Sequence, residues 1–123
     1  MANFTIAARI KSIAYALAGI ATMLRTQHNA WVHLVATVAA VLIAFWFGIS
    51  AIEWLALILA IVVVWTAEAL NTAFELLCDV ASPEFHPLVK QAKDVAAAAV
   101  LIAAVGAIAV GIVIFGPRLL ALA

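Results

Sequence analysis

Glu68, Asn71 and Glu75 follow one another at positions i, i+3 and i+7 in a chain that is otherwise mostly apolar. This spacing predicts that the three side chains share one face of a helix. A carboxylate at membrane depth costs about 2.5–3.5 kcal/mol on insertion scales, so intramembrane carboxylates usually mark a functional site. With a rise of about 1.5 Å per residue, Glu68 and Glu75 would lie about 10 Å apart along the helix. The alternative, polar residues that only hold helices together, is less favoured for two carboxylates than for an asparagine alone.

A second set of polar residues precedes the last apolar stretch. Lys93 supplies a positive charge for a phosphate, and Asp94 supplies a carboxylate that can hold a metal or position the lysine. An ion pair at a helix end is the common alternative for such a dipeptide. His86, in the segment PEFHP, could contact a nucleotide or stabilise the loop, and both remain open. His28 and His33 form no recognisable metal-ligand set and are interpreted as interfacial or packing residues.

Familiar phosphate-binding motifs are absent from the sequence. There is no glycine-rich loop ending in Lys-Ser/Thr, no HRD or DFG set and no HExxH motif, which excludes the P-loop and protein-kinase families. A phosphoryl-transfer enzyme of this kind would depend on positioning and on charge neutralisation by a metal and a lysine. The single cysteine, Cys78, excludes an internal disulfide and a cysteine-based metal cluster.

The composition indicates an integral membrane protein. Hydrophobic residues make up 70% of the 123 positions, well above the roughly 45–50% of a soluble domain. Six basic and six acidic residues balance to a formal net charge of zero, so no basic surface suggests a nucleic-acid partner.

The apolar pattern predicts one all-α membrane domain over residues 1–123. Three stretches are long enough to span a bilayer, at about 31–49, 54–78 and 95–115. A tight hairpin is expected at Gly48–Glu53. Ser82, Pro83 and Glu84 resemble the start of a helix, with an N-cap, a first-turn proline and a first-turn acid. Because Pro87 would strain that helix, a new helix is expected to start near Pro87 and to end at Gly116-Pro117.

An N-terminal amphipathic helix is expected at about 5–28, in the membrane interface. Ile13, Leu17, Ile20 and Leu24 recur at helical spacing, which suits a surface helix. A signal peptide is the alternative, because basic residues precede this apolar stretch.

The distribution of basic residues predicts the orientation. They concentrate before the first span and between the second and third spans, at Arg9, Lys11, Arg25, Lys90 and Lys93. The N-terminus and the segment 79–94 are therefore expected to be cytoplasmic.

Residues Ala67–Ala104, AEALNTAFELLCDVASPEFHPLVKQAKDVAAAAVLIAA, contain an ordered set of motifs. The pattern is E-x-x-N-[ST]-x-x-E, then D, then E-[YF]-H, then A-K-D before an Ala-rich span. It closely resembles the signature of the small prokaryotic diacylglycerol kinase family, which includes the undecaprenol kinases. A weaker likeness extends through Tyr15, Gly19 and Thr26–Leu34.

The resemblance implies a homotrimeric kinase of the bacterial cytoplasmic (inner) membrane that uses ATP and Mg²⁺ to phosphorylate a lipid alcohol. In this family Glu68 would be the base that activates the lipid hydroxyl, Asn71 would support that region, and Glu75 would bind the metal. The residues expected to contact the nucleotide are Tyr15, Glu75, Glu84, Phe85, His86, Lys93 and Asp94.

The chain departs from the family pattern at two positions. Gln27 stands where the family usually has a second metal-ligating glutamate, and Gln is a neutral, poorer ligand for magnesium. The family's ATP-contacting arginine aligns about one position from Arg9. The segment SPEFHPLVKQAKDVAAAAVL favours undecaprenol over diacylglycerol as the lipid, and both remain open.

A non-enzymatic membrane component is the alternative function. Glu68 and Glu75 could belong to an ion- or proton-conducting relay, or Gln27 could mark a catalytically weakened scaffold. A relay needs ionisable groups across the whole bilayer, whereas residues 54–65 contain none. This asymmetry favours a site that opens to one side of the membrane.

Overall fold

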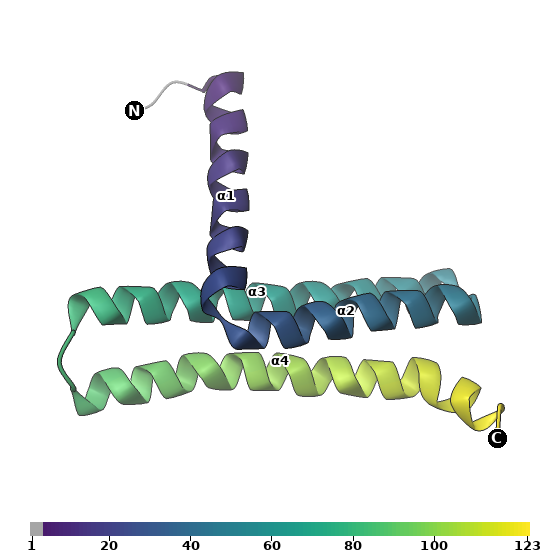
Figure 1. Cartoon of the computed structure of the whole chain (residues 1–123). Coiled ribbons are helices and arrows are strands. Elements are labelled where there is room, and N and C mark those ends of the chain that lie inside the picture. The colour runs from purple at the N-terminus through teal and green to yellow at the C-terminus, as the bar shows by residue number, and fades with distance from the viewer. Residues whose placement is uncertain (1–3) are drawn as a thin grey trace.

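The computed structural model of the chain describes residues 4–123, which form four α-helices. They are α1 (Ile6–Thr26), α2 (His28–Phe47), α3 (Ala51–Ala81) and α4 (Pro87–Leu120). Helices α2, α3 and α4 lie side by side, consecutive helices running in opposite directions, and α1 projects crosswise from this bundle (Figure 1). By length and composition, all four helices could cross a membrane. The all-α class is thus confirmed, and the chain is a multi-pass membrane protein.

The chain bends between α1 and α2 at a single residue, Gln27. Its backbone is extended, with φ −114° and ψ 116°, and it caps the end of α1 and the start of α2. Its N–H donates to the carbonyl of Met23 at 2.9 Å. Across the bend, the indole Nε1 of Trp31 donates to the carbonyl of Leu24 at 2.9 Å. The second hydrogen bond ties the first turns of α2 to the last turn of α1.

The hairpin between α2 and α3 matches the expected turn. Gly48 ends α2 with φ 60° and ψ 52°, a left-handed conformation that favours glycine. Ser50 then caps α3 through a reciprocal capping box, in which Glu53 N–H donates to Ser50 Oγ and Ser50 N–H donates to Glu53 Oε2. The capping box starts α3 three residues before the expected span.

The expectation that Ser82 begins a helix is wrong. Ser82 instead caps the end of α3, and its hydroxyl donates to the carbonyl of Glu84 at 3.1 Å. The expected start near Pro87 is confirmed, with His86 as N-cap accepting from Leu88 N–H at 3.2 Å. A helix starting at Pro83 would place Pro87 inside it, where proline lacks a donor and clashes with the preceding turn.

The expected end of the last helix at Gly116-Pro117 is also wrong, because α4 continues to Leu120. Arg118 explains the continuation. Its guanidinium donates to both carboxylate oxygens of Glu53 at 2.8 Å and to the carbonyl of Ile114 at 2.6 Å. This paired contact ties the last turn of α4 to the first turn of α3.

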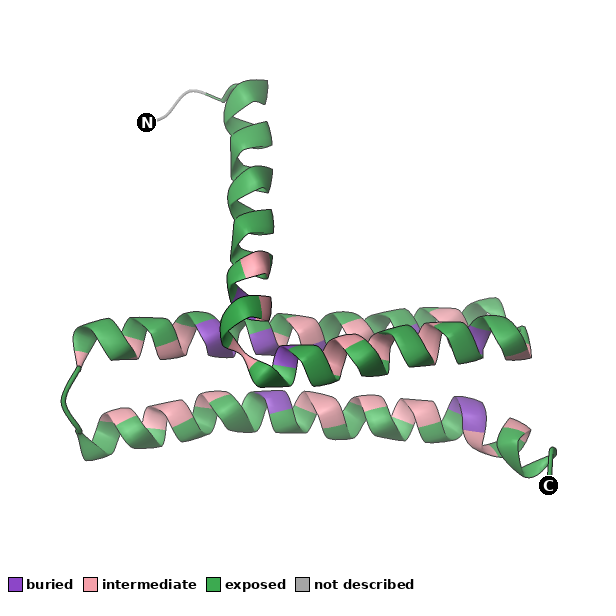
Figure 2. Ribbon diagram, viewed as in Figure 1, coloured by how far each residue is buried: buried purple, intermediate pink, exposed green. Residues whose placement is uncertain are grey.

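Buried residues are few and concentrate in two places (Figure 2). One apolar cluster closes the hairpin end of the bundle and contains Ala44, Ile49, Leu57, Ile114 and Phe115. The other buried group lies where the end of α1 meets α2 and α3, and it includes the polar residues described below. Large apolar side chains remain exposed on every helix, as expected of a surface that contacts lipid.

Candidate functional site

The three polar residues of α3 differ in burial along the helix. Glu68 is fully buried at 0% exposure, Asn71 is 7% exposed, and Glu75 is of intermediate exposure. Helix α3 has 31 residues and is therefore about 46 Å long, longer than the hydrocarbon core of about 30 Å. The helix is thus long enough to cross the hydrocarbon core and to extend beyond it.

The carboxylate of Glu68 faces His33 on α2. Nε2 of His33 lies 3.3 Å from Oε2 of Glu68, and the two side chains are 14% and 1% exposed. Their relative orientation falls short of a hydrogen bond, so within residues 4–123 neither atom has a hydrogen-bond partner. His33 is therefore part of a polar cluster rather than an apolar packing contact.

The same cluster contains further unused hydrogen-bonding capacity. Both carboxylate oxygens of Glu68 and Oδ1 of Asn71 are buried without a hydrogen-bond partner in the described chain. Thr72 does not contribute, because its hydroxyl donates to the backbone carbonyl of Glu68 at 2.8 Å. Buried polar groups are normally paired, and unpaired ones call for a ligand, a partner or a chemical role.

Glu75 meets the bend between α1 and α2. Nε2 of Gln27 donates to Oε2 of Glu75 at 3.3 Å. A carboxylate and a side-chain amide both offer oxygen atoms, and Mg²⁺ typically takes one or two protein oxygens together with water and phosphate oxygens. Glu75 offers its oxygens directly, whereas the amide of Gln27 turns its nitrogen toward Glu75 and would have to rotate to offer its oxygen to Mg²⁺. Residues 4–123 contain no group of three or more acidic, histidine or cysteine side chains that could hold a metal.

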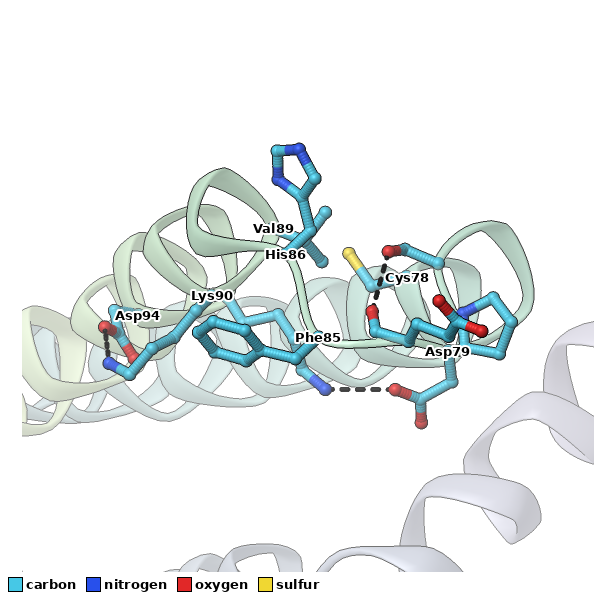
Figure 3. Close-up of a pocket in the computed structure, with 11 residues that line it drawn as sticks. Cys78, Asp79, Phe85, His86, Val89, Lys90 and Asp94 are labelled. Atoms are coloured by element: carbon cyan, nitrogen blue, oxygen red, sulfur yellow. Dashed lines mark hydrogen bonds and ion pairs between the residues drawn. The ribbon is translucent and has the colours of Figure 1, made fainter.

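A pocket of about 340 Å³ lies between the end of α3, the connection 82–86 and the start of α4 (Figure 3). Its volume falls in the range of small-molecule sites, about 300–1,000 Å³. At one wall Nζ of Lys93 lies 3.0 Å from Oδ1 of Asp79. Lys93 lies before the apolar stretch 95–115. Its hydrogen bond to Asp79 raises the pKa of Lys93, and the negative charge of Glu75 raises it further by a smaller amount. The lysine is therefore a permanent positive charge beside the pocket.

Lys93 and Asp94 do not pair with each other. Asp94 instead accepts from Nζ of Lys90, one turn earlier on α4, at 2.6 Å. Both members of that pair are well exposed and line the pocket. Because Lys93 bonds to Asp79, it joins α3 to α4, whereas Lys90 and Asp94 pair within α4.

Of the remaining predicted nucleotide contacts, three line the pocket and one, Tyr15, does not. Glu84, Phe85 and His86 line the same pocket as Lys93. His86 also caps α4, and its ring points away from Asp79 (Figure 3). Tyr15 lies on the exposed part of α1, with Nζ of Lys11 5.9 Å from its ring centre, and no described hydrogen bond joins it to the site.

No site role was predicted for Asp79 or His33. Asp79 could have been found, because it follows Glu75 by four residues on the same helical face and occupies the D of the family pattern. His33 carries no such signal, since its contact with Glu68 depends on how α2 packs on α3. Trp65 also joins α3 to α2, because its Nε1 donates to Oγ1 of Thr37 at 3.0 Å.

Comparison with known proteins identifies the family. Residues 14–115 match the family model described as prokaryotic diacylglycerol kinase. The chain is 39% identical to an undecaprenol kinase of Bacillus subtilis over 109 residues, covering 89% of each chain. It is 39% identical to a diacylglycerol kinase of Synechocystis over 112 residues, which cover 90% of this chain and 64% of the relative. It is 42% identical to a diacylglycerol kinase of Escherichia coli over 74 residues, covering 60% and 61% of the two chains. The chain therefore belongs to the prokaryotic diacylglycerol kinase family, a family of lipid kinases.

Proposed function

We propose that the chain transfers the terminal phosphoryl group of ATP to the hydroxyl group of a membrane lipid alcohol. The observation that carries this proposal is the gradient along α3, from fully buried Glu68 to half-buried Glu75, which lies one turn before the pocket residues Cys78 and Asp79. It offers a water-poor position for a lipid hydroxyl and a polar position for phosphates on one helix face. The names of the relatives, kinases of undecaprenol and of diacylglycerol, support a lipid alcohol as acceptor.

At the buried end, Glu68 acts as the general base. It takes the proton of the lipid hydroxyl while the hydroxyl oxygen attacks the terminal phosphorus and the bond to ADP breaks. The carboxylate oxygens have no hydrogen-bond partner among residues 4–123, so their lone pairs remain available for that proton. Asn71, one turn away and also unpartnered at Oδ1, supports the same region.

At the polar end, Lys93 neutralises phosphate charge, and Asp79 holds its ammonium group in place. Glu75, together with Gln27, would hold Mg²⁺. The metal, when bound, would supply charge neutralisation for the phosphate oxygens. Glu84, Phe85, His86 and Asp94 line the pocket and are proposed to contact the nucleotide, as is Tyr15 from α1.

Undecaprenol is the favoured acceptor. The undecaprenol kinase of Bacillus subtilis matches along 89% of both chains, whereas the diacylglycerol kinase of Synechocystis matches 90% of this chain but 64% of its own length. The sequence of residues 82–101, SPEFHPLVKQAKDVAAAAVL, also favours undecaprenol.

We propose that α1 lies in the membrane interface and that only α2, α3 and α4 span the bilayer of the bacterial inner membrane. The crosswise direction of α1 relative to the bundle supports this arrangement (Figure 1). The basic residues of α1 and those at the start of α4, Lys90 and Lys93, support a cytoplasmic N-terminus. Labelling of single cysteines, introduced at residue 4 and at residue 50 of a Cys78→Ser variant, with a membrane-impermeant reagent would test the orientation.

A homotrimer is proposed as the functional assembly. The buried and unpartnered groups of Glu68 and Asn71 support a composite site, to which a neighbouring copy contributes. Native mass spectrometry in detergent would test it, and a monomer with full activity would refute it.

One assay tests the activity itself. The purified protein in bicelles would be given radiolabelled ATP and magnesium with either undecaprenol or diacylglycerol. Labelled lipid is expected with undecaprenol at the higher kcat/KM, and absence of labelled lipid with both alcohols would refute the kinase. The Glu68→Gln variant serves as the matched negative control.

A further inference from the structure

We propose that His33 is a positioning residue for the reaction: its Nε2–H holds the carboxylate of Glu68 in the orientation that accepts the lipid proton. The inference rests on the proposed function, since it gives Glu68 the role of base. It assigns a catalytic consequence to a histidine that no motif singles out.

His33 and Glu68 lie close together in a buried part of the bundle. Nε2 of His33 lies 3.3 Å from Oε2 of Glu68, with side chains 14% and 1% exposed. Within the described chain, neither atom has another hydrogen-bond partner. A ring nitrogen that carries hydrogen is a donor, and an ionised carboxylate is only an acceptor, so the two groups are chemically matched.

The packing of α2 against α3 holds His33 and Glu68 in register. Trp65 precedes Glu68 by three residues on α3, and Thr37 follows His33 by four residues on α2. Nε1 of Trp65 donates to Oγ1 of Thr37 at 3.0 Å. The ring of Trp65 also meets the ring of His33 edge-on, with centres 6.4 Å apart. The hydrogen bond between Trp65 and Thr37 thus joins the two helices one turn from the pair of His33 and Glu68.

In this structure His33 and Glu68 are close enough to hydrogen-bond but are not aligned to do so. Catalytic hydrogen bonds are often long or poorly aligned before substrate binds and tighten in the reactive complex. At 3.3 Å, a small rotation of the imidazole completes the hydrogen bond. One oxygen of Glu68 then binds His33, and the other remains free for the proton of the lipid hydroxyl.

The test compares three variants of the full-length protein in bicelles. His33→Leu removes the donor, His33→Gln keeps an N–H at similar reach, and Thr37→Val removes only the neighbouring hydrogen bond. His33→Leu is expected to lower kcat roughly 10- to 100-fold, as for a misplaced catalytic group, without changing KM for ATP or lipid. His33→Gln is expected to recover most of the turnover, and Thr37→Val to retain it.

Three kinetic results would overturn the inference. They are an unchanged kcat in His33→Leu, an equal loss in His33→Gln, and an equal loss in Thr37→Val. The last result would show that helix register, rather than the donor, controls the rate.

A spectroscopic measurement tests the contact without turnover. In protein labelled with ¹⁵N-histidine, Glu68→Gln is expected to shift the Nε2 resonance of His33 and to leave those of His28 and His86 in place. No shift at His33 would overturn the inference even if His33→Leu fails to fold. A wild-type protein without lipid kinase activity would instead refute the proposed function, while the shift would still report the contact.

Discussion

Nε2 of Gln27 donates to Oε2 of Glu75 at 3.3 Å, although 48 residues separate the two in sequence. The contact exists because Gln27 is the one-residue bend between α1 and α2, which directs its side chain toward the polar end of α3. A neutral amide therefore occupies the position beside the proposed metal-binding carboxylate. Gln27 thus forms the bend of the chain and is also a member of the proposed metal site.

Replacing Gln27 with Glu should strengthen magnesium binding. The substitution places two carboxylates side by side, and a divalent cation relieves their repulsion. We expect the magnesium concentration that gives half-maximal activity to fall, and Gln27→Met to raise it or leave it unchanged. A magnesium titration in the lipid kinase assay would measure both, and identical titration curves for Gln27→Glu and wild type would contradict the assignment.

Glu68→Gln should nearly abolish turnover while ATP still binds. General-base catalysis contributes about 10²- to 10⁴-fold, and the amide keeps the size of the side chain without its basicity. Glu68 is fully buried at one end of the polar row formed by Glu68, Asn71 and Glu75. The Lys93 pocket lies beyond the other end of this polar row. Nucleotide affinity, measured by isothermal titration in detergent, is therefore expected to change little. Parallel losses of binding and turnover would argue against the base.

Lys93→Met should raise the KM for ATP, because it removes the positive charge that Asp79 holds beside the pocket. A hydrogen bond to a charged group contributes about 1.5–3 kcal/mol, so an increase of about 10- to 100-fold is expected. Lys90→Met is the matched control, since that lysine lines the same pocket but pairs with exposed Asp94 on its own helix. Similar KM values for the two variants would contradict a specific role for Lys93.

The pair Glu53–Arg118 should stabilise the fold without affecting activity. It joins α3 to α4 at the end of the bundle opposite the pocket. Glu53→Gln or Arg118→Met is expected to lower the temperature of thermal unfolding and to leave kcat unchanged. A kcat loss at unchanged thermal stability would contradict this structural role.

The same pair predicts a pH dependence of stability. Glu53 precedes the apolar stretch 54–78, and the hydrogen bond from Arg118 lowers the pKa of Glu53 from 4.5 to about 2. Because the folded-state pKa is lowered, this contribution is complete above the ordinary value and is lost as the pH falls from about 4.5 toward 2. Thermal unfolding of wild type and Glu53→Gln between pH 6 and 3 should therefore converge as the pH falls, and a constant difference would be inconsistent with it.

The sequence by itself determined the class of the protein and the order of its parts. Apolar stretches of fixed length predicted the helices, because an α-helix satisfies its own backbone hydrogen bonds in lipid. The spacing of Glu68, Asn71 and Glu75 predicted their common face, since helical periodicity is local. The brief break at Gly48–Glu53 predicted the hairpin, and the structure forms it with left-handed Gly48 and the Ser50–Glu53 capping box.

Tertiary structure decided which residues meet across helices. The contacts Gln27–Glu75, His33–Glu68 and Lys93–Asp79 all depend on the register and direction of packed helices. The last helix also continues past Pro117, where Arg118 binds Glu53, a residue 65 positions earlier in the sequence. Helical spacing along one segment contains no information about the rotation of the neighbouring helix. The polar row was therefore predictable from sequence, and its partners were not.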